Sequence, residues 1–292
     1  MKNSLERAGI IFCILILMLL IFFSLLNLVP ASVSAADDFY EEMCMAVITN
    51  NSEHLKELLD RGADPNAEDV DGTTILHFAS FAGNLELVKL LSDYGADINS
   101  VNDEGSSILM AGAINSAEIV NFLLEEGADI GYRDDDGYSA LMLAALLGKL
   151  DTVKTFLAHG ADIEAKNNNN ETLLMCAALN SPEIVNFLLE RGAEINAQTA
   201  DGDTALMRAS AMNNLETVKI LIAQGAEVNH TNKQGISSLM VAVMSSPEIA
   251  KFLIDQGADV KAESSVGFSV LDYAEMSGQQ EIIEIVKSAG AE

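Results

Sequence analysis

The sequence contains no tryptophan, and aromatic residues make up only 5% of its 292 residues. Its core must therefore come from aliphatic side chains, and a hydrophobic content of 49% is sufficient for one. Basic residues are also scarce, with 16 against 44 acidic ones and a formal net charge of −28. Nucleic-acid binding needs a basic surface, so we expect no nucleic-acid partner. An acidic surface instead aids solubility and favours a protein partner that presents a basic surface.

Motifs of catalysis and of cofactor binding are missing. There is no Gly-x-Ser-x-Gly, no phosphate-binding glycine loop and no His-Glu-x-x-His. A zinc site needs three or four converging ligands, whereas the four histidines are scattered along the chain at His54, His77, His159 and His230. We therefore expect a non-enzymatic protein with no catalytic residue, no metal site and no cofactor.

Acidic turns such as 134–137 resemble part of a calcium loop. A full loop carries a bidentate glutamate at its twelfth position, but twelve positions from Asp134 lies Ala145. Aspartate before glycine is typical of a tight turn, and this is the preferred interpretation. Weak calcium binding at these turns is the alternative.

What the sequence has in abundance is a repeat. A Gly-Ala pair followed by an acidic residue recurs every 32 or 33 residues, and a period of this size is typical of a solenoid. Between the pairs, a turn comes first, then an apolar helix such as 141–145, then a second apolar helix such as 183–189. The repeated pairs begin at Gly62, Gly95, Gly127, Gly160, Gly192, Gly225, Gly257 and Gly290.

This order, with the stretch Thr74-Ile75-Leu76-His77-Phe78-Ala79, resembles the ankyrin repeat, a turn and two helices with a Thr-Pro-Leu-His-x-Ala core. The resemblance covers roughly residues 39–292. It implies an all-α solenoid of about eight helix pairs with short β-hairpin turns. We divide the chain into an export segment, 1–36, and a repeat domain, 37–292. Phe39–Asp64 and the last unit are expected to be its caps, because each end repeat has one face without a neighbour.

Helix boundaries follow from the same pattern. Each second helix should end at the glycine of the Gly-Ala pair, which can adopt the left-handed conformation. Residues 118–128 and 183–193 are identical except for Glu126 and Arg191, which indicates duplication of a two-repeat unit. Each first helix should begin after a Ser or Thr cap, namely Thr74, Ser107, Ser139, Thr172, Thr204, Ser237 and Ser269.

The three cysteines cannot form an internal disulfide bond within this arrangement. Cys13 lies in the N-terminal apolar run, and Cys44 and Cys176 lie four repeats apart. Packed helices are about 10 Å apart, so the separation is on the order of 40 Å. A disulfide needs Cα atoms within about 7 Å.

The N-terminal segment predicts export. Lys2 and Arg7 precede an almost entirely apolar run over 10–28, and small residues follow it. This architecture is typical of a secretory signal peptide, with Val33 and Ala35 at the −3 and −1 positions of the cleavage site. The run is about 19 residues long, close to a membrane span, so an uncleaved anchor is the alternative.

Both alternatives place the repeats outside the cytoplasm, because basic residues precede the apolar run and acidic residues follow it. Exported chains without a possible internal disulfide are unusual in a secretory lumen, so the bacterial periplasm or secretion is favoured. The membrane would be contacted only through residues 10–28, if that segment is uncleaved. We expect a monomer.

One row of methionines occupies the histidine position of the ankyrin pattern, which only His77 retains. In the family that histidine helps to tie turns together, so the substitution suggests apolar stacking instead. We predict core packing, with a redox sensor or a flexible binding surface as the alternative. The row consists of Met110, Met142, Met175, Met207 and Met240.

A second apolar row lies about 140° from the buried direction of the first helices, at 100° per residue. In ankyrin repeats this position faces the concave groove, and contiguous exposed apolar surface marks interaction sites. Coverage of the row by neighbouring helices is the alternative. The row is Ile48, Phe81, Ile114, Leu146, Leu179, Ala211, Met244 and Met276.

The resemblance implies a protein–protein interaction module that binds its partner in the concave groove and at the turn tips. A membrane-anchored accessory or stabilising factor for an exported enzyme is the second hypothesis. The predicted groove residues are Phe81, Ile114, Leu146, Leu147, Leu179, Met212 and Met244. The predicted turn-tip residues are Asp71, Asp103, Glu104, Asp135, Asp136 and Asp203.

Overall fold

The computed structural model describes residues 37–291, which form helices joined by turns. The expected export segment, with its cleavage site and Cys13, lies outside the described residues. Within that part of the chain, the helices are α2 (Asp37–Ile48), α3 (Ser52–Asp60), α4 (Ile75–Phe81), α5 (Leu85–Asp93), α6 (Ile108–Ala113), α7 (Ala117–Glu125), α8 (Ala140–Leu146), α9 (Leu150–Ala158), α10 (Leu173–Ala177), α11 (Pro182–Leu189), α12 (Ala205–Ala211), α13 (Leu215–Ala223), α14 (Ser238–Ala242), α15 (Pro247–Asp255), α16 (Val270–Ser277) and α17 (Gln280–Ser288).

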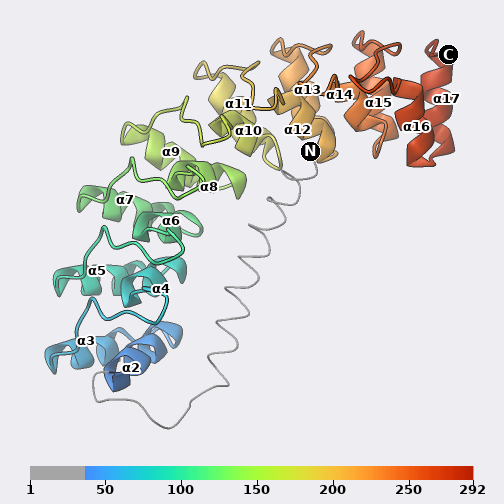
Figure 1. Cartoon of the computed structure of the whole chain (residues 1–292). Helices are drawn as coiled ribbons and strands as arrows, with labels where there is room; N and C mark the ends of the chain where they lie inside the picture. The colour runs from blue at the N-terminus through green and yellow to red at the C-terminus, as the bar shows by residue number, and fades with distance from the viewer. Residues whose placement is uncertain (1–36, 292) are drawn as a thin grey trace.

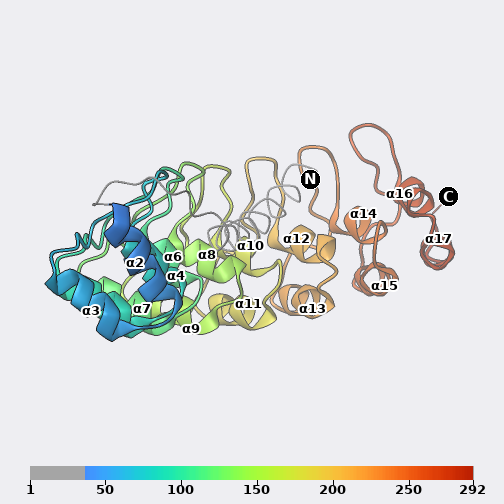
Figure 2. The same ribbon diagram turned by 90° about the horizontal axis from the view of Figure 1, so that it is seen from below.

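The helices stack as antiparallel pairs into an arc (Figure 1). The even-numbered first helices line the concave side, and the odd-numbered second helices cover the convex side (Figure 1). The connections between successive pairs project together to one side of the helical layers (Figure 2). The prediction of an all-α ankyrin-type solenoid is therefore confirmed.

The predicted helix boundaries are also confirmed. The seven Ser and Thr residues proposed as caps are the N-caps of α4, α6, α8, α10, α12, α14 and α16. In six of these helices the cap oxygen accepts a hydrogen bond from the third helical N–H, as Thr172 does from Met175. At the other end, the glycine of each Gly-Ala pair has a positive φ, such as +93° at Gly62.

The core runs continuously along the solenoid between the two helical layers. It consists mainly of aliphatic side chains such as Leu76, Leu91 and Val120, with Phe156 as its largest fully buried side chain. All five members of the methionine row are buried, so the prediction of core packing is confirmed. Burial of this kind is the main stabilising contribution in a repeat protein, because each pair covers the apolar face of the next.

Hydrogen bonds join successive turns into a ladder. The N–H of Asp103 donates to the carbonyl oxygen of Asp71 (2.9 Å), and the N–H of Asn168 donates to that of Asp136 (3.1 Å). His77 Nε2 lies 3.0 Å from the carbonyl oxygen of Ser106 in the next turn, as the family resemblance implies. These bonds hold the turns in a fixed row.

The acids that open the turns serve the turns themselves. Asp69 Oδ1 accepts hydrogen bonds from the N–H groups of Asp71 (3.0 Å) and Thr73 (2.8 Å). Asp134 Oδ1 accepts one from Tyr138 (2.7 Å). Segments 69–72 and 134–137 are therefore tight turns, as preferred, but the acid whose side chain closes each turn is three residues before the glycine and not directly before it. Among residues 37–291, no helix is long and apolar enough to cross a membrane.

Candidate functional site

Three positions in each repeat line the concave side. They lie one residue before the N-cap and four and seven residues after it. The last two share a helix face, because three residues at 100° each leave them only 60° apart. We call this combined face the inner surface. At the fourth position, Phe78, Leu143, Arg208 and Tyr273 are partly exposed, whereas Ala111, Cys176 and Val241 are buried.

Five of the predicted groove residues, Phe81, Ile114, Leu146, Leu179 and Met244, lie at the seventh position of this inner surface, and Leu147 and Met212 lie one residue further on. None of the seven predicted groove residues is fully buried. Met212 and Met244 are each 43% exposed, and the related Met276 is 53% exposed. Leu146 packs partly against the core. The remaining members, Phe81, Ile114, Leu147 and Leu179, are half-buried. Their role in binding stays a prediction.

Five of the six predicted turn-tip acids are exposed, and the sixth was placed wrongly. Asp203 is buried, and its Oδ1 accepts a hydrogen bond from Asn232 Nδ2 (2.8 Å). The reason is its position after Gly202, at the base of the hairpin next to the Thr204 cap. The acid at that tip is Asp201, which is exposed. The five exposed acids are Asp71, Asp103, Glu104, Asp135 and Asp136.

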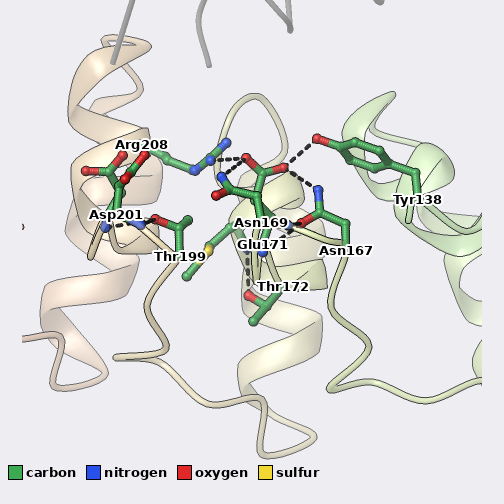
Figure 3. Close-up of polar contacts among 10 residues, drawn as sticks. Tyr138, Asn167, Asn169, Glu171, Thr172, Thr199, Asp201 and Arg208 are labelled. Carbon is green, nitrogen blue, oxygen red and sulfur yellow. Dashed lines mark hydrogen bonds and ion pairs between the residues drawn. The ribbon is translucent and has the colours of Figure 1, made fainter. Parts of the chain in front are cut away.

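The centre of the inner surface carries a polar network that joins three repeats. Glu171 lies between Tyr138 and Arg208, with Asn167 and Asn169 beside it (Figure 3). One carboxylate oxygen of Glu171 accepts from the Tyr138 hydroxyl and from Asn167 Nδ2 (2.8 Å). The other accepts from Arg208 Nη2 and, at 3.4 Å, from Asn169 Nδ2. The carboxylate is thus held from both neighbouring repeats.

This network is largely withdrawn from water. The side chains of Glu171 and Arg208 are only 7% and 12% exposed. Burial favours the neutral acid, but the Arg208 charge and hydrogen bonds from Tyr138, Arg208 and Asn167 outweigh it and lower the pKa of Glu171. Burial and the bond to Glu171 raise the pKa of Tyr138. We therefore describe a charged pair with a neutral tyrosine hydroxyl at the centre of the groove.

Four consecutive asparagines build the turn beneath this network. Asn167 Oδ1 accepts from the N–H groups of Asn169 and Glu171, both at 2.9 Å. Asn168 Nδ2 donates to the carbonyl oxygen of Asp135 (2.9 Å), and Asn170 takes the left-handed φ of +57° that glycine has in the other turns. Asn167, Asn168 and Asn170 therefore each have a defined role in the structure of this turn.

Sequence reasoning missed this network. A signal was present, because Arg208 is the only lysine or arginine in the first helices from α4 to α16. Glu171, in turn, occupies a position that the neighbouring repeats fill with tyrosine and aspartate. Their contact spans 37 residues, more than one repeat, so a single-repeat pattern does not pair them.

In the described part of the chain, the cysteines and histidines do not cluster into a metal site. Cys44 and Cys176 are both free thiols, as the spacing argument predicts, and burial raises the pKa of each to about 12. Neither is therefore a reactive thiolate at neutral pH. Over residues 37–291 no cluster of His, Cys, Asp and Glu has the arrangement of a metal site.

Comparison with known proteins agrees with the fold. Models described as "Ankyrin repeats (3 copies)" match residues 43–134, 115–199 and 206–292, and one described as "Ankyrin repeats (many copies)" matches 179–222. Among solved structures, the ankyrin repeat domain of human ASB11 is similar, with a TM-score of 0.69 and 27% identity over 74% of this chain and 98% of that one. A comparison with curated proteins gives no match.

Ankyrin-repeat arrays are generally non-enzymatic and serve as protein–protein interaction modules. The matched regions together cover most of the chain. The repeat pattern, the stacked helix pairs and these matches agree with one another, and this chain belongs to the ankyrin-repeat family.

Proposed function

We propose that this protein binds a partner protein on its inner surface and acts outside the cytoplasm. The observation that carries the first part is the row of partly exposed apolar side chains along the concave side, from Phe81 to Met276. Contiguous apolar surface of this kind is unfavourable in water and gains free energy when a partner covers it.

The charge of the protein favours a partner with a basic surface. The net charge is −28, and acidic side chains stand at the turn tips beside the apolar floor. Apolar contacts that become buried should determine how long the complex lasts, whereas charges at the rim should determine the association rate and its salt dependence.

Photocrosslinking tests the surface assignment. We place a photoreactive amino acid at Met244, on the inner surface, or at Lys251, an exposed residue on the second helix of the same pair. The partner should crosslink from Met244 and not from Lys251. Crosslinking from Lys251 alone would move the binding site to the convex side.

An alanine double variant tests the energetics. Met212→Ala with Met244→Ala should weaken partner binding by more than about 1 kcal/mol, the usual threshold for an important contact. The unfolding midpoint should change little, because both side chains are 43% exposed. The control is Glu216→Ala on α13 with Gln224→Ala at its C-cap, both exposed, and it should bind normally. Normal binding by the methionine variant would contradict the proposal.

The second part of the proposal rests on the sequence of residues 1–36. Mass spectrometry of the native protein should find a new N-terminus at Ala36 or Asp37. An intact Met1 in the membrane fraction would instead support the anchored form, with the repeats outside the cytoplasm. An intact Met1 in the cytoplasm would contradict export in either form.

A further inference from the structure

The acidic residues of the turns are concentrated in one half of the solenoid. The first three turns, 69–72, 102–105 and 134–137, hold seven acidic residues and no basic one. The four later turns, 167–170, 199–202, 232–235 and 264–267, hold one aspartate and one lysine, so their charges cancel. Of the charged residues directly beside these turns, Glu68 offsets Arg133 in the first group. In the later group Lys166 offsets Glu263, Glu171 pairs with Arg208, and the buried Asp203 leaves one negative charge, so the contrast remains seven against one.

The acidic turns form a fixed array. The N–H of Asp103 donates to the Asp71 carbonyl oxygen, which holds these two tips side by side. Neighbouring repeats are about 10 Å apart, close to the Debye length of about 8 Å at physiological salt, so the fields of adjacent tips overlap. A cation near one tip is attracted by its neighbours as well.

The opposite end of the inner surface is apolar and aromatic. On the last repeat, Phe268 is 43% exposed and Met276 is 53% exposed. The Phe268 ring packs edge-on against Tyr273, with ring centroids 6.2 Å apart. Beside them stand Met244 on the preceding repeat and the turn-tip residue Val266, which is 73% exposed. These residues suit apolar or aromatic anchors of a partner.

The central network separates the two ends without adding charge. Glu171 and Arg208 neutralise each other and are nearly buried. A partner therefore meets an apolar floor along the inner surface, with an acidic rim beside it over α4 to α8 and no net charge at its centre. The strongly exposed Phe268 and Met276 lie at its far end, at α16.

We propose that the partner presents a polypeptide segment of segregated composition that binds in one direction. Its Lys/Arg-rich part lies at the turns of residues 69–137, and its apolar, aromatic part covers α14 to α16. This inference rests on the proposed function, since it specifies how the inner surface is used.

The distance fixes the length of such a segment. The middle of the acidic turns lies five repeats from α16, or about 50 Å at about 10 Å per repeat. An extended chain covers that distance with about 15 residues, and a helix with about 33.

Two synthetic peptides of about 33 residues test the proposal. Both have the same lysine, arginine, leucine, phenylalanine and methionine content. One carries its basic residues in one half and its apolar residues in the other, and the second has them evenly mixed. By fluorescence anisotropy at physiological salt, the segregated peptide should bind the full chain at least about tenfold more tightly than the mixed one. Equal affinity, or no binding by either peptide, would overturn the proposal.

Charge variants test whether the basic half of the peptide binds at the acidic turns. Asp103→Asn, Asp135→Asn and Asp136→Asn together should remove most of the advantage of the segregated peptide. The control changes three exposed acids on or beside the second helices, Asp93→Asn, Glu126→Gln and Asp255→Asn, and removes the same charge. If the control has an equal effect, net charge alone governs binding and the directional model is wrong.

Crosslinking determines the direction in which the peptide binds. Photoreactive residues replace Val70, 94% exposed at the first turn, or Val266 at the last. The Val70 position should label the basic half of the peptide, and the Val266 position the apolar half. Reversed or indiscriminate labelling would overturn the proposal. The native partner's crosslink from Met244 tests the proposed function separately, so a failure of direction is distinct from a failure of inner-surface binding.

Discussion

The polar network at the centre of the groove should stabilise the protein by an amount that mutation can measure. Arg208→Met removes the cation that Glu171 contacts and keeps a flexible side chain of moderate length. It leaves a carboxylate that is only 7% exposed without its charged partner. Breaking a buried ion pair in this way costs about 3–5 kcal/mol. Since Tyr138 and Asn167 still donate to the carboxylate, we expect about 3 kcal/mol, the lower end of that range.

A double-mutant cycle isolates the interaction. Glu171→Gln leaves Arg208 unpaired, whereas Glu171→Gln with Arg208→Met leaves no charge. The double variant should therefore be more stable than the sum of the single effects predicts, with a coupling free energy of about 1–3 kcal/mol. Stability is measured by urea unfolding followed by far-ultraviolet circular dichroism at pH 7.

Hydrogen exchange locates the effect. Solenoid stability is approximately a sum of repeat and nearest-neighbour contributions, so protection should fall in α10 and α12 and not in α4. The exposed Lys56–Asp60 pair on α3, 2.6 Å apart, is the control, and Asp60→Asn should change stability little. Additivity of the two single substitutions within about 0.5 kcal/mol would refute the reasoning.

Further predictions concern pH and repeat deletion. Folding lowers the pKa of Glu171, so its contribution to stability is present above the ordinary glutamate pKa of about 4.3 and is lost as pH falls through the folded value. The stability of Glu171→Gln should therefore depend less on pH in the acid range. Burial also lowers the pKa of His77, so the protein should lose stability as pH falls below about 6.5. Between pH 7 and 5 the urea midpoint of His77→Met should fall less than that of the unsubstituted protein, and an equal fall would contradict this. The raised pKa of Tyr138 should make stability decline above a pH of about 10, where the tyrosine of the unfolded chain ionises. In a spectrophotometric titration, Tyr138→Phe should lack the late tyrosine ionisation that the unsubstituted protein shows. Deleting 62–126 or 127–191, 65 residues each, should leave a helical solenoid. Only the second deletion removes Glu171, so that variant should unfold at a lower urea concentration than the first. A lower urea midpoint for the first deletion would contradict the role of the network.

Much of the architecture was predictable because it is local and repeated. Ser107 and Thr172 cap their helices through hydrogen bonds to residues three positions away. Gly62 ends its helix through its own φ angle. Such contacts depend on a few consecutive residues, and seven copies of one pattern reinforce each inference.

The surface was predictable only in part. The angle of Met244 from the buried face follows from helix geometry, and it is exposed as that angle indicates. Asp203 was misplaced because the turn sequence Asp201-Gly202-Asp203 reads as uniformly acidic. Only the hairpin geometry separates Asp201 at the tip from Asp203 at the buried base.

Periodicity within 32 or 33 residues was enough to predict the repeat, its two helices, their caps and the apolar rows. The contacts of Glu171 with Tyr138 and Arg208 follow from the stacking of the repeats, since each residue belongs to a different repeat. The stacking also decided which apolar rows neighbouring repeats cover. Burial at an interface depends on the stacking distance and curvature of the solenoid, which act between repeats and leave no signature within one.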